Sequence, residues 1–309
     1  MPDSIQWATQ RFKQIWIIDG STLEQLFRKL ESLQAVERAP LAGKMVTIID
    51  LVTRLPVQIW FGENPKQSDA KFEANILAET PAHTLLLLDR GFYHFQFFAD
   101  LMAQQVDFIT RLKANAHFSV ERSLSTSHGH RDQVILLGTK RKNSPQVRLR
   151  LIQVRFGKTW YRYMTSVLAP KTLPPFAVAD LYRRRWRIEQ AFSTVKRLLG
   201  LSYLWTGSVN GVKLQLWATW LFFAVLVDLG DAVADELGVP FERISLEMLY
   251  RGLYHFGVAR QASKAAAPVT YFAAAENQDL RVVKILRKPL AKLDLNPFPR
   301  DDLTFVPSS

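Results

Sequence analysis

The sequence of 309 residues contains no cysteine, which excludes a disulfide framework and a zinc site built on thiolates. Its N-terminus lacks the charged start and apolar run of a secretory signal. Its most apolar stretch, residues 216–227, is shorter than the ~20 residues that span a bilayer. That stretch predicts a buried core helix, and the three absences together predict a cytoplasmic protein.

Acidic side chains are scarce in one continuous part of the chain. Residues 111–160 hold eleven basic and two acidic side chains, a net charge of +9, and residues 161–200 hold eight and two, a net charge of +6. The whole chain carries +12, so all of the excess lies within residues 111–200, the basic block. Arginine outnumbers lysine there, and its guanidinium fork matches phosphate oxygens, which favours a polyanionic partner over a merely solvated face.

Apolar strands alternate with helical patterns in the first part of the chain, and this alternation predicts an α/β sheet. Strands are expected at 15–19, as a pair within 44–61, at 83–89 and at 106–115, and helices at 22–33, 68–79 and 92–105. From about residue 117 to 169, short alternating segments separated by polar turns predict an all-β insertion. Helices are then expected at 182–200, near 214–230 and at 245–256, followed by an irregular tail.

Two of the predicted strands end in an aspartate followed closely by glycine, in "IIDGST" with Asp19 and in "LLDRGF" with Asp89. Either motif alone is equally well explained as a turn or a helix cap. In open α/β sheets, however, ligands bind at the carboxyl ends of the strands. If the two strands are neighbours, the two carboxylates converge there.

A third carboxylate, Glu189, lies in the helix predicted at 182–200, among six cationic side chains. At 100° per residue the core stripe of this helix consists of Leu181, Ile188, Phe192, Val195 and Leu199. The arc beside that stripe carries a phenol, a guanidinium, a carboxylate and an ammonium: Tyr182, Arg185, Glu189 and Lys196. An ordinary surface ion pair explains Arg185 with Glu189, but not the other two side chains on the same edge.

Three converging carboxylates beside arginines are what metal-dependent phosphoryl transfer on DNA requires. Carboxylate oxygens hold Mg²⁺ or Mn²⁺, and two such ions activate the attacking oxygen and stabilise the leaving one. The arginines supply the positive surroundings that admit a phosphodiester. We therefore predict two ions held by Asp19, Asp89 and Glu189.

These motifs resemble those of the DDE insertion-sequence transposases of the IS-four family. "DGST" at 19–22 and "DRGFY" at 89–93 resemble the motifs around the first and second aspartates of that family. The four residues of its YREK signature, and the spacing between them, are matched by Tyr182, Arg185, Glu189 and Lys196. The resemblance runs in order from about residue 15 to residue 201 and includes the β-rich insertion.

The resemblance implies an RNase H-like fold, a mixed sheet flanked by helices with an inserted β-rich subdomain and C-terminal helices. The expected division is residues 1–115 for the first part of the core, 116–172 for the DNA-contacting insertion, 173–212 for the catalytic helix and 213–309 for the C-terminal region. It also implies a bacterial, nucleoid-associated enzyme that acts on transposon terminal inverted repeats and target DNA, and a homodimer in the synaptic complex.

The family also implies roles for single residues. Tyr182, Arg185 and Lys196 would grip the backbone of the transposon end, with Arg183 beside them. Members cut by way of a hairpin and stack a flipped base on an aromatic of the insertion, for which Trp160 is the candidate and Tyr161 the next choice.

Two readings stay open beside that of an active transposase. Family members usually carry a helical DNA-binding region before the first aspartate, which here is residue 19, so a truncated or inactive remnant that only binds DNA or a partner is the alternative. A structure-selective nuclease would share the three acids.

His128 and His130 in "SHGH" are interpreted as a solvated polar turn, or at most a phosphate contact.

Overall fold

The computed structural model describes residues 3–24, 41–138 and 145–281. The described residues form two compact units. Unit 1 contains residues 3–22, 43–138 and 145–189, and unit 2 contains residues 190–281 with the short stretches 23–24 and 41–42. The helix predicted at 22–33 and the irregular tail after 281 lie outside the described residues, apart from the first positions of that helix, which belong to a strand.

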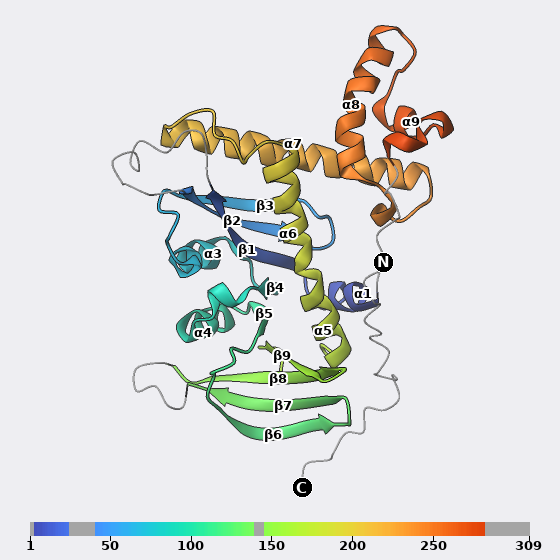
Figure 1. Cartoon of the computed structure of the whole chain (residues 1–309). Helices are drawn as coiled ribbons and strands as arrows, with labels where there is room; N and C mark the ends of the chain where they lie inside the picture. Colours follow the sequence, from blue (N-terminus) through green and yellow to red (C-terminus); the bar gives the residue numbers. More distant parts are fainter. Residues whose placement is uncertain (1–2, 25–40, 139–144, 282–309) are drawn as a thin grey trace. The chain divides into compact units, whose positions relative to one another are not determined.

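Unit 1 is built on one sheet of nine strands in the order β3-β2-β1-β4-β5-β9-β8-β7-β6 (Figure 1). The strands are β1 (Gln14–Glu24), β2 (Leu41–Asp50), β3 (Pro56–Gly62), β4 (Thr84–Leu88), β5 (Asp107–Arg111), β6 (Phe118–Thr126), β7 (His130–Leu137), β8 (Val147–Phe156) and β9 (Thr159–Thr165). β1, β4 and β5 are parallel neighbours, whereas β2 with β3 and β5 with β9 are antiparallel. The predicted class, a mixed α/β sheet flanked by helices, is confirmed.

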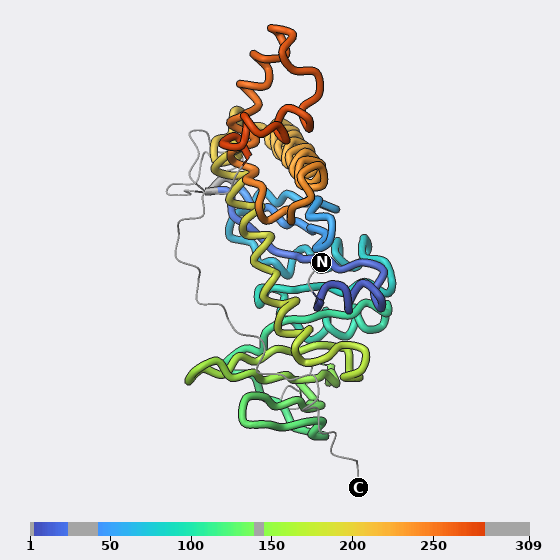
Figure 2. Tube along the Cα trace, turned by 90° about the vertical axis from the view of Figure 1, so that its right-hand side faces the viewer, coloured from blue at the N-terminus to red at the C-terminus, as the bar shows by residue number. Residues whose placement is uncertain are grey.

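The central strands are apolar on both faces because helices cover both faces. Alternate residues of β1 and β4, such as Trp16 and Leu88, pack in a cluster with α3 (Glu73–Glu79) and α4 (Phe95–Ala103). On the other side of the sheet lies α5 (Pro175–Arg184), which contacts β5, β8 and β9 (Figures 1 and 2). A helix that the sequence did not predict, α1 (Asp3–Thr9), packs against α5.

The β-rich segment between residues 117 and 169 continues the core sheet. β9 pairs with β5 from Ile109 opposite Thr165 to Arg111 opposite Tyr163, and β8, β7 and β6 follow outward. The predicted insertion is therefore present as strands, and it shares a hydrogen-bonded sheet with the strands that carry Asp19 and Asp89.

The helix predicted at 182–200 is interrupted. α5 ends at Arg184, α6 (Trp186–Ser193) follows after a break at Arg185, and the π-helix η3 (Thr194–Leu198) completes the segment. Most of the predicted core stripe is buried, including Leu181, Ile188 and Val195. A π-turn adds a residue to the helical repeat and is often found at functional sites, so a uniform 100° per residue was wrong for the C-terminal part.

Unit 2 contains α7 (Val209–Glu236), α8 (Leu246–Gln261) and α9 (Pro268–Ala273), which enclose a small apolar core. α7 is much longer than the predicted core helix, and by length and composition alone it is apolar enough to cross a membrane, a test that core helices also pass. The prediction of a buried helix is wrong for one face of α7. Leu214, Trp217 and Leu221 on that face are 72%, 60% and 68% exposed.

Candidate active site

The two aspartates of the sequence motifs lie side by side. β1 and β4 run parallel with Ile18 opposite Leu88, so Asp19 and Asp89, the next residues, lie beside one another. Asp89 follows the end of β4 as predicted, whereas β1 does not end at Asp19 but continues to Glu24. Asp19 accepts a hydrogen bond from the N–H of Gly20 at 2.8 Å, and Asp89 caps the 3-10 helix η2 (Arg90–Phe92) through the N–H of Gly91 at 3.2 Å. Asp89 therefore caps a helix and also faces the site.

A single guanidinium holds the three predicted acids together. Arg185 lies at the break between α5 and α6, and its nitrogens approach Asp19 Oδ2 at 2.6 Å, Glu189 Oε1 at 2.8 Å and Asp89 Oδ1 at 3.5 Å. Arg185 is 8% exposed, and its Nε has no hydrogen-bond partner among the described residues. Burial works against its charge, but Asp19 and Asp89 outweigh that effect and keep the pKa of Arg185 above its ordinary value.

The donor chemistry of this cluster fits a hard divalent cation. Three carboxylates on different elements converge on one positive group, and oxygen ligands of this kind suit Mg²⁺ or Mn²⁺. As the side chains stand, no group of three acidic or histidine side chains in the described part of the chain is arranged to hold an ion. Arg185 lies between the three acids, so the residues fit a metal once that guanidinium withdraws.

Asp19 is held in surroundings that oppose its negative charge. Burial raises its pKa from 3.8 to about 6, with a further upward contribution from Asp89, and Arg185 only partly offsets this. The ionised carboxylate of Asp19 therefore lowers the free energy of unfolding of the metal-free protein.

That lowering predicts a pH-dependent gain in stability for Asp19→Asn. Between pH 3.8 and about 6 the folded state binds more protons at Asp19 than the unfolded state, so stability falls as the pH rises through that window. Metal-free Asp19→Asn should then be more stable than the parent by up to about 3 kcal/mol at pH 7.5, and the difference should vanish near pH 3.5. Urea unfolding measured at both pH values checks this, and a difference that does not change with pH would contradict it.

The residues of the predicted YREK edge lie in different surroundings. Tyr182 is 7% exposed, and burial raises its pKa to about 12. The guanidinium of Arg185 lies 5.9 Å from the centre of its ring. Arg183 is half exposed and pairs with Asp180 at 2.9 Å. Lys196 lies in the π-helix η3, which belongs to unit 2. The other three residues of the predicted edge, Tyr182, Arg185 and Glu189, belong to unit 1.

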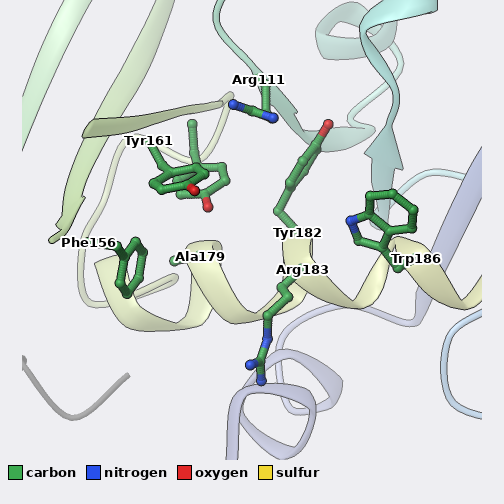
Figure 3. Close-up of a pocket in the computed structure, with 8 residues that line it drawn as sticks. Arg111, Phe156, Tyr161, Ala179, Tyr182, Arg183 and Trp186 are labelled. Atoms are coloured by element: carbon green, nitrogen blue, oxygen red, sulfur yellow. The ribbon is translucent and has the colours of Figure 1, made fainter. Parts of the chain in front are cut away.

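A pocket of about 190 Å³ is lined by Tyr182 and Trp186, the two aromatic residues that flank Arg185 (Figure 3). Tyr182 and Trp186 point into it from the helix, and Tyr161, Phe156 and Arg111 face them from the strands. Arg111 lies 5.6 Å from the centre of the Tyr161 ring, and Phe156 meets that ring edge-on at 5.5 Å. Trp186 and Arg111 were not predicted as site residues. The available signal was the adjacency of Trp186 to Arg185, and the structure adds that Trp186 is 61% exposed and can offer a stacking surface.

Trp160, the aromatic predicted to receive a base, does not line this pocket. Trp160 and Tyr161 are consecutive on β9, and successive side chains of a strand point to opposite faces. Trp160 is half-buried beneath Arg131 of β7, whose guanidinium lies 5.2 Å from the ring centre. The role of Trp160 remains a prediction, while Tyr161 is the one of the two that reaches the pocket.

Part of the basic block is used inside the fold. Arg150 is fully buried and forms two hydrogen bonds to Asp132, at 2.7 and 2.6 Å, and a third to the carbonyl of Leu173. His130 is also buried, between Ser125 and Ser127, and burial lowers its pKa. The interpretation of "SHGH" as a solvated turn is therefore wrong for His130.

The family model described as the transposase DDE domain matches residues 10–226. The chain belongs to this family. The match covers the segment from β1 to the middle of α7, including all three acids, Arg185 and the strands of the insertion.

Among curated proteins, the chain is 28% identical over 192 residues to the transposase InsG for insertion sequence element IS4 of Escherichia coli, which covers 58% of this chain and 42% of that protein. It is 26% identical over 172 residues to the probable transposase for insertion sequence element IS5377 of Geobacillus stearothermophilus, covering 54% and 45%. The aligned part thus spans about half the length of these relatives.

Among solved structures, the chain resembles a piggyBac transposase in a synaptic complex with hairpin DNA. The TM-score is 0.46 at 11% identity, over 89% of this chain and 59% of that one. A likeness at this level decides nothing about function.

Proposed function

We propose that this protein is a transposase that cleaves DNA at transposon ends and joins it to target DNA with the help of two divalent metal ions. The observation that carries the proposal is the convergence of Asp19, Asp89 and Glu189 on one guanidinium at the edge of the sheet. Mg²⁺ or Mn²⁺, when bound by these three carboxylates, would activate the attacking oxygen and stabilise the leaving one.

Within this proposal Arg185 has two successive partners. In the metal-free protein it neutralises part of the charge of three carboxylates, two of them at 2.6 and 2.8 Å. Those carboxylates must turn toward the ions, which frees the guanidinium for a phosphate of the entering DNA. Tyr182 and Trp186 flank Arg185 at 5.9 and 5.8 Å and would limit where it moves.

The pocket beside Arg185 would receive a base flipped out of the transposon end. Its lining combines aromatic rings with arginine, which is the chemistry of a sequence-tolerant stacking surface. Hairpin formation bends the terminal strand sharply, and the bend is easier when one base leaves the stack.

DNA binding by this surface should depend steeply on salt. Each phosphate neutralised by a basic side chain contributes about 0.9 to the slope of log K against log salt concentration. Replacing Arg183, Arg185 and Lys196 by glutamine should therefore flatten the slope by up to about three times that amount. Arg251→Gln on α8 removes an exposed arginine outside the basic block and should leave the slope unchanged. Equal slopes for the triple variant and the parent would show that the basic block faces elsewhere.

A second copy of the chain is the proposed partner of the exposed face of α7. Leu214, Trp217, Leu221 and Val225 follow one another at helical spacing along that face, which ends at exposed Lys213 on one side and exposed Asp228 on the other. Antiparallel pairing about a twofold axis near Leu221 places each lysine opposite the partner copy's aspartate. Charge complementarity at both ends therefore favours a homodimer.

Disrupting this face should yield monomers. Leu221→Asp places a charge at the axis, so we expect loss of the dimer in analytical ultracentrifugation, whereas Tyr254→Asp, at an exposed aromatic of α8, should leave it intact. Lys213→Asp should weaken the dimer, and adding Asp228→Lys should restore it. A monomeric parent that binds lipid vesicles through α7 would instead assign this face to a membrane.

The alternative, a remnant that binds DNA without cutting it, is tested with DNA that carries the terminal inverted repeats flanking the gene. The proposal expects Mg²⁺- or Mn²⁺-dependent nicking at the repeat ends by the parent chain. Binding without nicking under both metals would favour the remnant, and nicking at branched structures regardless of the repeats would favour a nuclease.

A further inference from the structure

The glycines of the two aspartate motifs pack against a fourth carboxylate. Asp69 opens the 3-10 helix η1 (Asp69–Phe72), and its side chain lies against Gly20 on one side and Gly91 on the other. A methyl group added at Gly20 would collide with Asp69 Oδ1, and one added at Gly91 would collide with Oδ2. One carboxyl group thus touches the part of β1 that follows Asp19 and the turn that follows Asp89.

This contact explains why both motifs contain glycine. Neither Gly20 nor Gly91 is among the residues with positive φ, so an L-amino acid fits the backbone at both positions. A side chain at either position has no room, because the carboxylate of Asp69 occupies the space that its Cβ atom would need. The glycines are therefore needed for close approach to Asp69.

The carboxylate is itself held in place by the sheet. Lys44 of β2 pairs with Asp69 Oδ1 at 2.5 Å, with side-chain exposures of only 14% and 16%. The same ammonium donates to the carbonyl of Gln67 at 3.2 Å, which ties down the loop that leads to η1. Because both partners are mostly withdrawn from solvent, this ion pair is screened less than a surface pair.

We propose that Asp69 is a positioning residue that holds the part of β1 after Asp19 and the turn after Asp89 at a fixed separation, so that both carboxylates face the same metal site. The inference rests on the proposed function for the identity of that site. Oδ1 of Asp69 faces Gly20 of β1 and Oδ2 faces Gly91, and the pairing with Lys44 fixes the carboxylate between them. Asp69 acts on the segments that carry the metal ligands, since it packs against Gly20 and Gly91 and Lys44 offsets its charge.

The first experiment measures the parent and Asp69→Ala in two ways that do not require catalysis. Titration with Mn²⁺ followed by electron paramagnetic resonance should show metal affinity about 10–100-fold weaker in the variant, the range typical of losing a group that orients metal ligands. Hydrogen exchange of the metal-free protein should be faster in both segments, 19–22 and 89–93, because each loses the same support.

Asp50→Ala is the matched control. Asp50 also caps a turn, by accepting from the N–H groups of Val52 and Thr53 at 2.8 Å. Its neighbour Leu51 donates to the carbonyl of Ile15, so Asp50 lies beside the start of β1, whereas Asp19 lies in the middle of that strand. We expect Asp50→Ala to change neither the Mn²⁺ affinity nor the hydrogen exchange of residues 19–22 and 89–93.

A double-mutant cycle separates positioning from general damage. Gly91→Ala alone should weaken Mn²⁺ binding, because the methyl group displaces Asp69. In the Asp69→Ala background the methyl group has room, so the double variant should bind Mn²⁺ no worse than Asp69→Ala alone. If Asp69→Ala does not fold, Asp69→Asn and Lys44→Met replace it, and each should give a smaller loss in the same direction.

The outcomes distinguish this inference from the proposed function. The role of Asp69 would be overturned if Asp69→Ala keeps the parental Mn²⁺ affinity and hydrogen exchange. It would also be overturned if the losses of Mn²⁺ affinity in Asp69→Ala and Gly91→Ala add up in the double variant. Either result would count even if Glu189→Gln abolishes Mn²⁺ binding. Unchanged Mn²⁺ binding in Glu189→Gln would instead overturn the metal site itself, and with it the proposed function.

Discussion

Glu189→Gln should abolish DNA cleavage while leaving DNA binding nearly intact. The substitution keeps the shape of the side chain and its contact with Arg185, but removes the charge with which it would hold a metal ion. Metal ions contribute several kcal/mol of charge stabilisation to the transition state. A loss of about 4 kcal/mol corresponds to roughly 10³-fold in rate, since each 1.36 kcal/mol is tenfold.

Single-turnover nicking of DNA that carries the terminal repeats measures this effect, with binding followed by fluorescence anisotropy. Glu247→Gln is the matched control, because Glu247 also forms an i,i+4 pair with an arginine but lies on α8, far along the chain from the acid cluster. Nicking by Glu189→Gln at the parental rate would exclude this carboxylate from the chemistry. Equal losses of binding and nicking would give it a structural role.

Tyr161→Ala should slow hairpin formation and resolution by about one to two orders of magnitude. Stacking of a base on an aromatic contributes roughly 1–3 kcal/mol, and each tenfold in rate corresponds to about 1.4 kcal/mol. Tyr161 lines the pocket next to Tyr182 and Trp186, and its ring is held by Phe156 and Arg111. First-strand nicking precedes the distortion of the DNA and should change much less.

Trp160→Ala provides a matched comparison within the same strand. If the base enters the pocket of Figure 3, Tyr161→Ala should be the more damaging of the two substitutions, since Trp160 lies on the other face of β9 with Arg131. An abasic site at the flipped position should partly rescue the damaged variant. A large hairpin defect in Trp160→Ala alone would restore the sequence-based assignment, and equal defects in nicking and hairpin steps would make either residue a packing residue.

The strands that carry the site were predictable because their signals are local. Apolar runs bounded by Asp and Gly predicted β1 and β4, and Ser68 was correctly predicted to begin a helical segment, as it caps η1. Helical spacing correctly placed Arg185 next to Glu189, since residues four apart on a helix are neighbours.

What the sequence by itself determined, then, is the succession of strands in unit 1, the location of the basic block and which three acids meet at Arg185. Each follows from composition or from spacing along one element. The tertiary structure alone decided which side chains meet across elements. It placed Arg185 between Asp19 and Asp89, used Arg150 to neutralise Asp132, and brought Asp69 against Gly20 and Gly91.

The physical reason is that these contacts depend on strand order and on which face of a strand a residue occupies. A register shift of one residue exchanges the two faces, so the choice between Trp160 and Tyr161 required the pairing of β9 with β5 and β8. Likewise, Asp69 and Lys44 are 25 positions apart and lie on different elements, and no periodic pattern in the sequence connects them. Only the fold, by placing Lys44 of β2 and Asp69 of η1 next to Gly20 and Gly91, brought that carboxylate beside the acid cluster.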